Sequence, residues 1–194
     1  MKKNFLLLIA FPFAIWLVAC NNESKDSVEK ADSVNEAKTD TAGTSAKNTI
    51  AVDKDCSEFM VRAASGGMME VELGKLALEK AKNQRVKDFG AMMVRDHSKG
   101  GDELKGLAAA KNVTLPATVG EDHQKHMDDL NKKSGLDFDK AYMKMMVDDH
   151  KEDISDFEKA SQNATDADVK AWATKTLPIL RTHLDSAQAI NKKL

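Results

Sequence analysis

Three histidines and one glutamate could form a metal site if the fold brings them together. His97, His150 and His183 each lie near the centre of an apolar face of a predicted helix. Glu70 lies among small apolar residues at helical spacing in a further segment. Imidazole nitrogens bind zinc, copper, iron or nickel, and thioethers of nearby methionines would shift the preference toward Cu(I). We therefore predict an inward-facing polar group, for which a transition metal is the one cofactor that the residue types suggest.

The same side chains also fit an arrangement without metal. Buried imidazoles and carboxylates need hydrogen-bond partners, and they can supply these to one another. Asp96 and Asp149 each precede a histidine at the edge of the apolar face, where they could orient the ring but are poorly aimed as ligands. No histidine follows a glutamate by three residues, so the Glu-x-x-His pattern of di-iron bundles is absent. A metal site and a hydrogen-bonded network both stay open.

Residue counts from the predicted turns give the relative heights of these side chains along the helices. Glu70 and His97 should lie within about 4 Å of each other along the axis. His150 and His183 should differ by about 8 Å, which predicts that His183 faces methionines instead. Paired glycines on the two helices, at 66–67 and 100–101, are nearly level, so we expect these helices to approach closely there.

Other residues with reactive side chains give weaker patterns. His123 and His126 could share a helix face and bind a surface metal, and Cys56 is expected to be a surface thiol at a helix start. Methionines on the apolar faces are expected mainly to fill the core. There is no phosphate-binding glycine loop, no haem-attachment Cys-x-x-Cys-His and no Ser–His–Asp arrangement. We therefore predict no catalytic residues, and an enzyme is not favoured.

Four helices are needed to position the polar group. Apolar residues recur every three or four positions in four long segments, over 57–81, 84–111, 137–161 and 166–192. Short polar breaks near 82 and 164 predict two antiparallel hairpins. The long connection between them contains a predicted short helix near 121–133. This pattern predicts an all-α four-helix bundle of ferritin-like connectivity, with two hairpins joined by a long crossover.

Details within these segments support the same fold. The run Met92–His97 matches Met145–His150 at five of six positions, so two helices should present equivalent surfaces to one core. Asp166 is a predicted cap of the last helix. Pro178 falls opposite the apolar face of that helix, which predicts a solvent-side kink and not a helix end.

Three motifs in the bundle can be compared with known families. They are GGMMEVELG at 66–74, VRDHSK at 94–99, and Thr-Leu-Pro at 176–178 followed by His-Leu at 183–184. Together they resemble a large bacterial domain-of-unknown-function family, whose members are exported and are often labelled "predicted outer membrane protein". The resemblance covers about residues 56–190. It implies a ferritin-like helical bundle in the cell envelope and no established activity.

The first 19 residues are predicted to be a lipoprotein signal peptide. Two lysines precede an apolar run over 5–19, which is shorter than the roughly 20 apolar residues of a membrane span. The segment Leu-Val-Ala-Cys at 17–20 resembles the bacterial lipobox, which implies that Cys20 is acylated and becomes the first residue of the mature chain. Asn21, where an Asp would favour the inner membrane, implies the outer membrane facing the periplasm.

A spacer is predicted between the lipid and the bundle. Residues 21–55 contain no Leu, Met, Phe, Trp or Tyr, so we expect residues 20–55 to comprise the lipidated cysteine and a disordered tether. Such a tether would hold the domain on the order of 30 Å from the bilayer. The domain itself is expected over residues 56–194.

Composition excludes several classes of protein. With 29 Lys and Arg against 31 Asp and Glu, the chain has no basic excess for binding nucleic acid, and two cysteines exclude a disulfide scaffold. The partner that the sequence predicts is the membrane, through Cys20; no protein partner is predicted. We expect a non-enzymatic envelope lipoprotein with a structural, stress-related or interaction role. The alternatives are a metal-binding bundle and a periplasmic chaperone-like module, which would need an exposed apolar patch.

Overall fold

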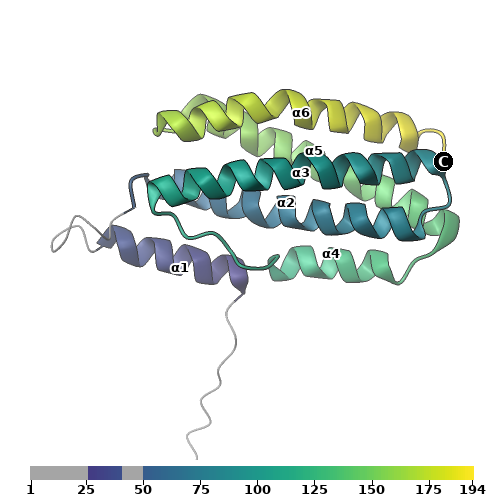
Figure 1. Cartoon of the computed structure of the whole chain (residues 1–194), viewed down its shortest axis with the longest axis horizontal. Helices are drawn as coiled ribbons and strands as arrows, with labels where there is room; N and C mark the ends of the chain where they lie inside the picture. Colours follow the sequence, from purple (N-terminus) through teal and green to yellow (C-terminus); the bar gives the residue numbers. More distant parts are fainter. Residues whose placement is uncertain (1–25, 41–49) are drawn as a thin grey trace, which may run out of the picture.

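The computed structural model describes residues 26–40 and 50–194, and within these ranges it contains six helices and no strands. The predicted all-α class is therefore confirmed (Figure 1). The long helices lie within two residues of the predicted ranges at nearly every end, and the short crossover helix is present. The helices are α1 (Ser27–Asp40), α2 (Lys54–Lys80), α3 (Gln84–Lys111), α4 (Glu121–Asn131), α5 (Gly135–Asn163) and α6 (Ala167–Asn191).

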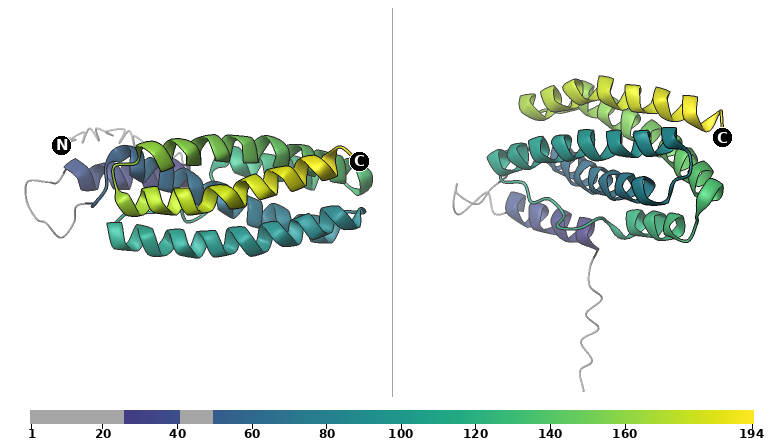
Figure 2. Two further views of the ribbon diagram at one scale, coloured as in Figure 1. Left: turned by 90° about the horizontal axis from the view of Figure 1, so that it is seen from above. Right: turned by 45° about the vertical axis from the view of Figure 1, so that its right-hand side comes forward.

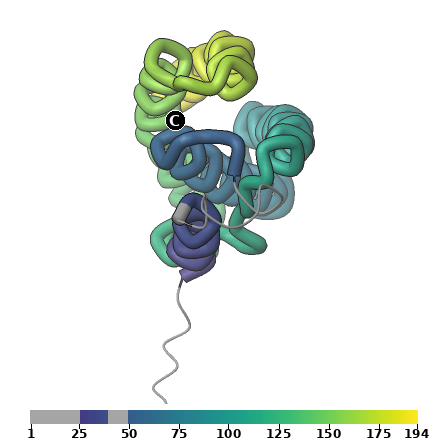
Figure 3. The backbone as a smooth tube through the Cα atoms, turned by 90° about the vertical axis from the view of Figure 1, so that its left-hand side faces the viewer, coloured from purple at the N-terminus to yellow at the C-terminus, as the bar shows by residue number. Residues whose placement is uncertain are grey.

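The helices stack in three layers (Figure 1). Helices α2 and α3 form one long hairpin and α5 and α6 form another, and the α2–α3 pair is in the middle. Helices α1 and α4 follow one another along the far side of α2, as the end-on view shows (Figure 3). Residues 112–134, which comprise α4 with its flanking loops, carry the chain from the first hairpin to the second (Figure 2).

Side-chain caps fix where the helices begin. Asp53 accepts a hydrogen bond from the Cys56 amide, and Asp166 accepts from the amides of Asp168 and Val169, as predicted for Asp166. Helix α6 runs through the exposed Pro178 without ending, again as predicted. These caps satisfy amides that have no partner within the helix.

A buried carboxylate joins the two hairpins at one end. Asp139 on α5 is fully buried and accepts hydrogen bonds from the backbone amides of Lys82 and Asn83, in the turn between α2 and α3. Asn83 in turn caps α3 through the Arg85 amide. The turn of the first hairpin is thus fixed to the side of the second, which sets the relative height of the helices.

The apolar core forms two clusters along the bundle. One lies toward the α2–α3 turn and the other toward the opposite end, and each contains residues from all four long helices. On α3, α5 and α6 the predicted site residue falls in sequence between the members of the two clusters, and on α2 Glu70 directly follows Met69, a member of the first cluster. Representative members are Met69, Phe89, Met93, Tyr142 and Met146 in the first cluster, and Phe59, Leu104, Phe157, Trp172 and Leu180 in the second.

The close approach of α2 and α3 occurs at a different pair of glycines from those predicted. A Cβ on Gly74 would lie 2.7 Å from the Gly90 carbonyl oxygen, and a Cβ on Gly90 would lie 2.8 Å from that of Gly74. At Gly67, Gly100 and Gly101 a Cβ would meet no atom within 4 Å. The prediction was wrong because equal height does not ensure that two glycines face the partner helix.

The predicted disordered tether is wrong for residues 27–40, which form α1. Ala31 and Asn35 are each 2 % exposed, and α1 packs on α2. The Asn35 side chain donates to the Thr114 carbonyl at 2.9 Å and accepts from the Thr114 amide at 2.7 Å. Polar contacts and one small buried side chain therefore dock this helix, so a search for large apolar residues misses it.

Two further predictions concern Cys56, in the first turn of α2, and the N-terminal segment. Cys56 is 3 % exposed, with its Sγ 3.8 Å from the Thr165 hydroxyl, so it is a buried thiol and not the expected surface one. The predicted signal peptide, Cys20 and Asn21 lie outside the described residues. None of the helices in the described ranges is long and apolar enough to cross a membrane.

We predict opposite effects of one substitution at two glycines. Gly74→Ala should lower the free energy of unfolding by about 1–3 kcal/mol, because the new methyl group meets the Gly90 carbonyl. Gly106→Ala, on the exposed side of α3 with open space around it, should raise the free energy by about 0.5–1 kcal/mol. Urea unfolding followed by circular dichroism measures both. Effects of the same sign would contradict the packing described above.

Candidate metal centre

The four predicted polar side chains meet in the middle of the bundle, one from each long helix. Glu70 comes from α2, His97 from α3, His150 from α5 and His183 from α6. Glu70, His150 and His183 are at most 1 % exposed, and the His97 side chain is 11 % exposed. The group lies between the two apolar clusters, so water has little access to it.

Short distances link the four side chains. Glu70 Oε2 lies 2.7 Å from His97 Nδ1, and Glu70 Oε1 lies 3.3 Å from His150 Nε2. His150 Nε2 also lies 3.3 Å from His183 Nδ1. The three imidazole centroids are 5.2–5.7 Å apart. The carboxylate of Glu70 therefore spans two imidazoles, and His150 contacts both neighbours.

The predicted separation of His150 and His183 was wrong. His150 lies thirteen residues before the end of α5, and His183 lies sixteen residues after the start of α6. This difference corresponds to about 4.5 Å along the axis, which the two rings span. His183 therefore contacts His150 and does not turn toward methionines. The error came from counting both distances from residue 164, which lies next to the end of α5 and not at the middle of the turn.

The outer nitrogens of two imidazoles have fixed partners. His150 Nδ1 lies 2.9 Å from the Met146 carbonyl oxygen, which can only accept, so this nitrogen carries the proton. His183 Nε2 lies 3.0 Å from Asp96 Oδ2 and donates to that carboxylate. Asp96 is itself paired with Arg95 at 2.8 Å. In the neutral rings, His150 Nε2 and His183 Nδ1 are therefore both unprotonated, and their lone pairs face each other.

Asp149 belongs to the same group, although its position in the helical repeat predicted a place at the edge. Ligand atoms of Glu70, Asp149 and His150 all lie within 4.8 Å of one another, as do those of His97, His150 and His183. The two sets share His150. Asp149 is half-buried, which agrees with the predicted edge position, and its carboxylate reaches the group from there.

Burial shifts the protonation of the group. It raises the pKa of Glu70 to about 8 and lowers the pKa of His150 to about 3. Burial also lowers the pKa values of His97 and His183 to about 4. The pKa of Asp149 is raised, first by burial and then by the nearby Glu70. At neutral pH the imidazoles are thus neutral and able to bind a metal, while a proton stays on the carboxyl pair.

Several buried polar atoms of this group make no hydrogen bond among the described residues. They include Glu70 Oε1, His97 Nε2 and Asp149 Oδ2, together with the hydroxyl of Tyr142. Such atoms normally have partners in a folded protein. Glu70 Oε1 lies 3.3 Å from His150 Nε2 and makes no hydrogen bond to it. A cation bound here would satisfy the unpaired oxygen and nitrogen atoms.

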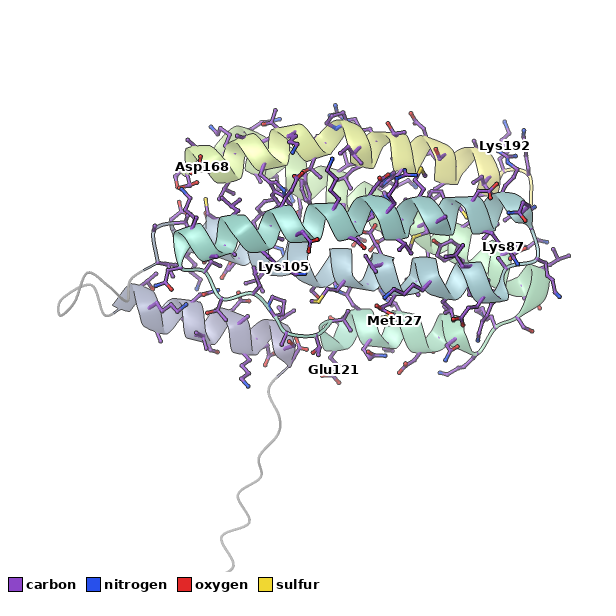
Figure 4. All side chains as sticks on the ribbon, viewed as in Figure 1. Lys87, Lys105, Glu121, Met127, Asp168 and Lys192 are labelled. Carbon is purple, nitrogen blue, oxygen red and sulfur yellow. The ribbon has the colours of Figure 1, made fainter. Side chains whose placement is uncertain are left out.

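A cavity of about 670 Å³ adjoins one side of the centre and is lined by Glu70, His97 and His183. Gly67, on α2, and Gly100 and Gly101, on α3, also line it. Each glycine inside a helix costs about 1 kcal/mol relative to alanine. Lys105 on α3 and Met127 on α4, labelled in Figure 4, mark two helices that border the cavity.

The predicted surface metal pair does not form. His123 Nδ1 lies 2.7 Å from the Ser65 hydroxyl, and His126 is exposed. Neither histidine belongs to a potential metal-binding group of the described residues. The Ser65 hydroxyl also accepts from the Gly120 amide at 2.9 Å, so His123 helps to fix the loop before α4.

Comparison with known proteins identifies the family. The model of the family described as "Domain of unknown function (DUF4142)" matches residues 41–190, so the chain belongs to that family and the predicted resemblance is confirmed. No curated protein matches the sequence.

Two solved structures are similar in fold. A DUF305 fragment from Deinococcus radiodurans has a TM-score of 0.66 at 9% identity, covering 74% of this chain and 99% of that one. CopM in its Cu(II)-bound form has a TM-score of 0.61 at 14% identity, covering 71% of this chain and 96% of that one. At these identities the likeness shows the fold alone.

The lowered imidazole pKa values predict that the three buried histidines destabilise the metal-free protein in acid. The unfolded chain takes up protons on these histidines below about pH 6.5, whereas the folded chain resists until about pH 4. The free energy of unfolding should therefore fall as pH falls across this window, by up to about 1.4 kcal/mol per pH unit for each imidazole. Glu70, Asp149 and Asp153 act in the opposite direction, because their raised pKa values stabilise the protonated folded state, so the contribution of an imidazole is measured by removing it.

Urea unfolding at pH 5, 6 and 7 tests this dependence. Relative to the wild type, His97→Gln should lose a contribution to the slope of up to about 1.4 kcal/mol per pH unit, because one imidazole that only the unfolded chain protonates is removed. His126→Gln, an exposed change, is the matched control and should leave the slope unchanged. Equal slopes in the wild type and in His97→Gln would contradict the assignment.

Proposed function

We propose that this member of the DUF4142 family binds one transition-metal ion, preferably Cu(II), through His97, His150, His183 and Glu70. The observation that carries the proposal is the pair of unprotonated nitrogens, His150 Nε2 and His183 Nδ1, held 3.3 Å apart beside a carboxylate. A cation bound between these groups would be coordinated by the two nitrogen lone pairs, which otherwise repel each other. A hydrogen-bonded network alone leaves acceptors facing acceptors in the buried centre.

The donor set suits copper. Neutral imidazoles with a carboxylate bind divalent ions of the first transition row, and Cu(II) forms the strongest complexes among them. CopM, a protein of similar fold, is described in a Cu(II)-bound form. That likeness supports testing copper first, while the choice of ligand residues rests on the geometry of this chain alone.

The surrounding residues would hold the ligands in place. The Met146 carbonyl fixes the ring of His150, and Asp96 fixes that of His183, so both rings present the correct nitrogen. Glu70 shares its proton with Asp149 in the metal-free state, and binding would displace that proton. When bound, the ion would supply a redox-active or Lewis-acid centre in a water-poor core.

We further propose that the two-hairpin arrangement with its long crossover is of the ferritin-like type, and that the domain works in the cell envelope. In this proposal residues 1–19 are removed, Cys20 carries the lipid, and the outer membrane facing the periplasm is the location. The alternative chaperone-like role has little support, because the large exposed apolar side chains of the described residues are single ones on four different helices: Val34, Leu78, Leu136 and Ile179.

Copper binding can be tested on the full chain purified without an affinity tag. We expect one equivalent of Cu(II) and an electron paramagnetic resonance spectrum with couplings to imidazole nitrogens. His97→Ala combined with His150→Ala should weaken binding at least 100-fold, whereas His126→Ala should leave it unchanged. Circular dichroism confirms that each variant is folded. Absence of stoichiometric metal in the wild type, or its retention in the double variant, would refute the proposal.

Lipid attachment has its own test in cells. Globomycin, which blocks cleavage of lipoprotein signal peptides, should leave a larger precursor on a gel, and Cys20→Ser should abolish the mature band. A palmitate analogue should label the wild type and should not label Cys20→Ser. A band that neither treatment shifts would show that the anchor prediction is wrong, with no bearing on copper.

A further inference from the structure

The cavity beside the centre has glycines where packing does not require them. A Cβ added at Gly67, Gly100 or Gly101 would have no atom within 4 Å, unlike one at the tightly packed Gly74. On α3, Gly100 and Gly101 follow His97 by three and four residues, so they share its helix face. Larger side chains there would fill the space next to His97. The glycines thus keep open a route to the centre at a cost in helix stability.

The cavity has an apolar wall and two unpartnered nitrogens. Phe157, Trp172 and Leu180 line it on the side of the second core cluster. Trp172 Nε1 and His97 Nε2 are buried and have no hydrogen-bond partner among the described residues. The indole nitrogen can only donate. A molecule in this space would therefore meet aromatic and aliphatic surface, one N–H donor, and the edge of the metal centre.

The side chains that line the cavity do not favour an anion. Its inner part is lined by the carboxyl groups of Glu70, Asp96 and Asp153, and the lysines that line it, 99, 105 and 175, are on exposed surface. Lys175 is already paired with Glu103 at 2.9 Å. An anionic ligand would face acidic groups close to the metal, so an uncharged one is favoured.

We propose that this cavity binds a small uncharged molecule with an apolar ring or chain and one nitrogen or oxygen donor atom, and that this atom reaches the bound metal next to His97. The proposal rests on the metal site proposed above. A volume of about 670 Å³ is within the range of small-molecule sites. The apolar part lies against Phe157, Trp172 and Leu180, and the donor atom lies at the end formed by Glu70, His97 and His183.

The probe for this site is 4-phenylimidazole, which has one aromatic body and one donor nitrogen. Titrated into the copper-loaded full chain, it should change the paramagnetic resonance spectrum in a saturable manner. Gly101→Leu should keep the copper and its spectrum but weaken the probe at least tenfold. Gly106→Leu makes the same change in the same helix away from the cavity, and should bind the probe as the wild type does.

A second readout separates this inference from copper binding. Saturation-transfer NMR on the metal-free chain should show contact of the phenyl protons with the protein, and this contact should be lost in Gly101→Leu and in Gly67→Leu. If copper fails to bind but this pattern holds, the metal proposal fails and the cavity site stands. If the wild type shows neither signal, or if the folded Gly101→Leu and Gly67→Leu variants bind the probe unchanged, the cavity proposal is overturned.

Discussion

Two nitrogen lone pairs that face each other at 3.3 Å in the core are the constraint on which the rest of the structure depends. The rings cannot turn to avoid this contact, because the Met146 carbonyl holds one and Asp96 holds the other. Apolar clusters on either side limit hydration of the centre. In such surroundings an unmatched polar group is far more costly than in water. A cation bound between the rings would remove this repulsion, and the low pKa values of His150 and His183 disfavour a proton there.

Glycine has two opposite uses in α2 and α3. At Gly74 and Gly90 the missing side chain lets the two backbones touch, so α2 and α3 approach closely between the polar group and their turn. At Gly67 and Gly101 the same absence leaves space that no neighbouring atom fills. At Gly74 and Gly90 close packing offsets the low helix propensity of glycine. At Gly67 and Gly101 no packing offsets it, so the helix loses stability. Access of a ligand to the buried residues, as proposed above, would explain why the loss is tolerated.

The sequence predicted the long helices and the inward-facing histidines because both depend on a period of 3.6 residues, which is directly visible in the order of residues. It did not predict how the helices meet. His183 was placed too far from His150 because small errors at helix ends add up along two helices. Asp149 was placed at the edge of the apolar face, and the helical period alone did not show that its carboxylate reaches Glu70 and His150 from there. Helix α1 was missed since polar pairs such as Asn35 with Thr114 leave no hydrophobic signal.

Helix α1 also changes how an anchored domain would sit. It begins at Ser27 and is fastened to the loop before α4, where Asp26 accepts from the Glu121 amide and the Ser27 hydroxyl accepts from the Thr118 amide. With a lipid on Cys20, six peptide steps separate the bilayer from the folded body, which is at most about 20 Å of chain. Such a body would travel with the lipid and meet other envelope components by lateral diffusion, with the side that carries Thr118 and Glu121 nearest the headgroups.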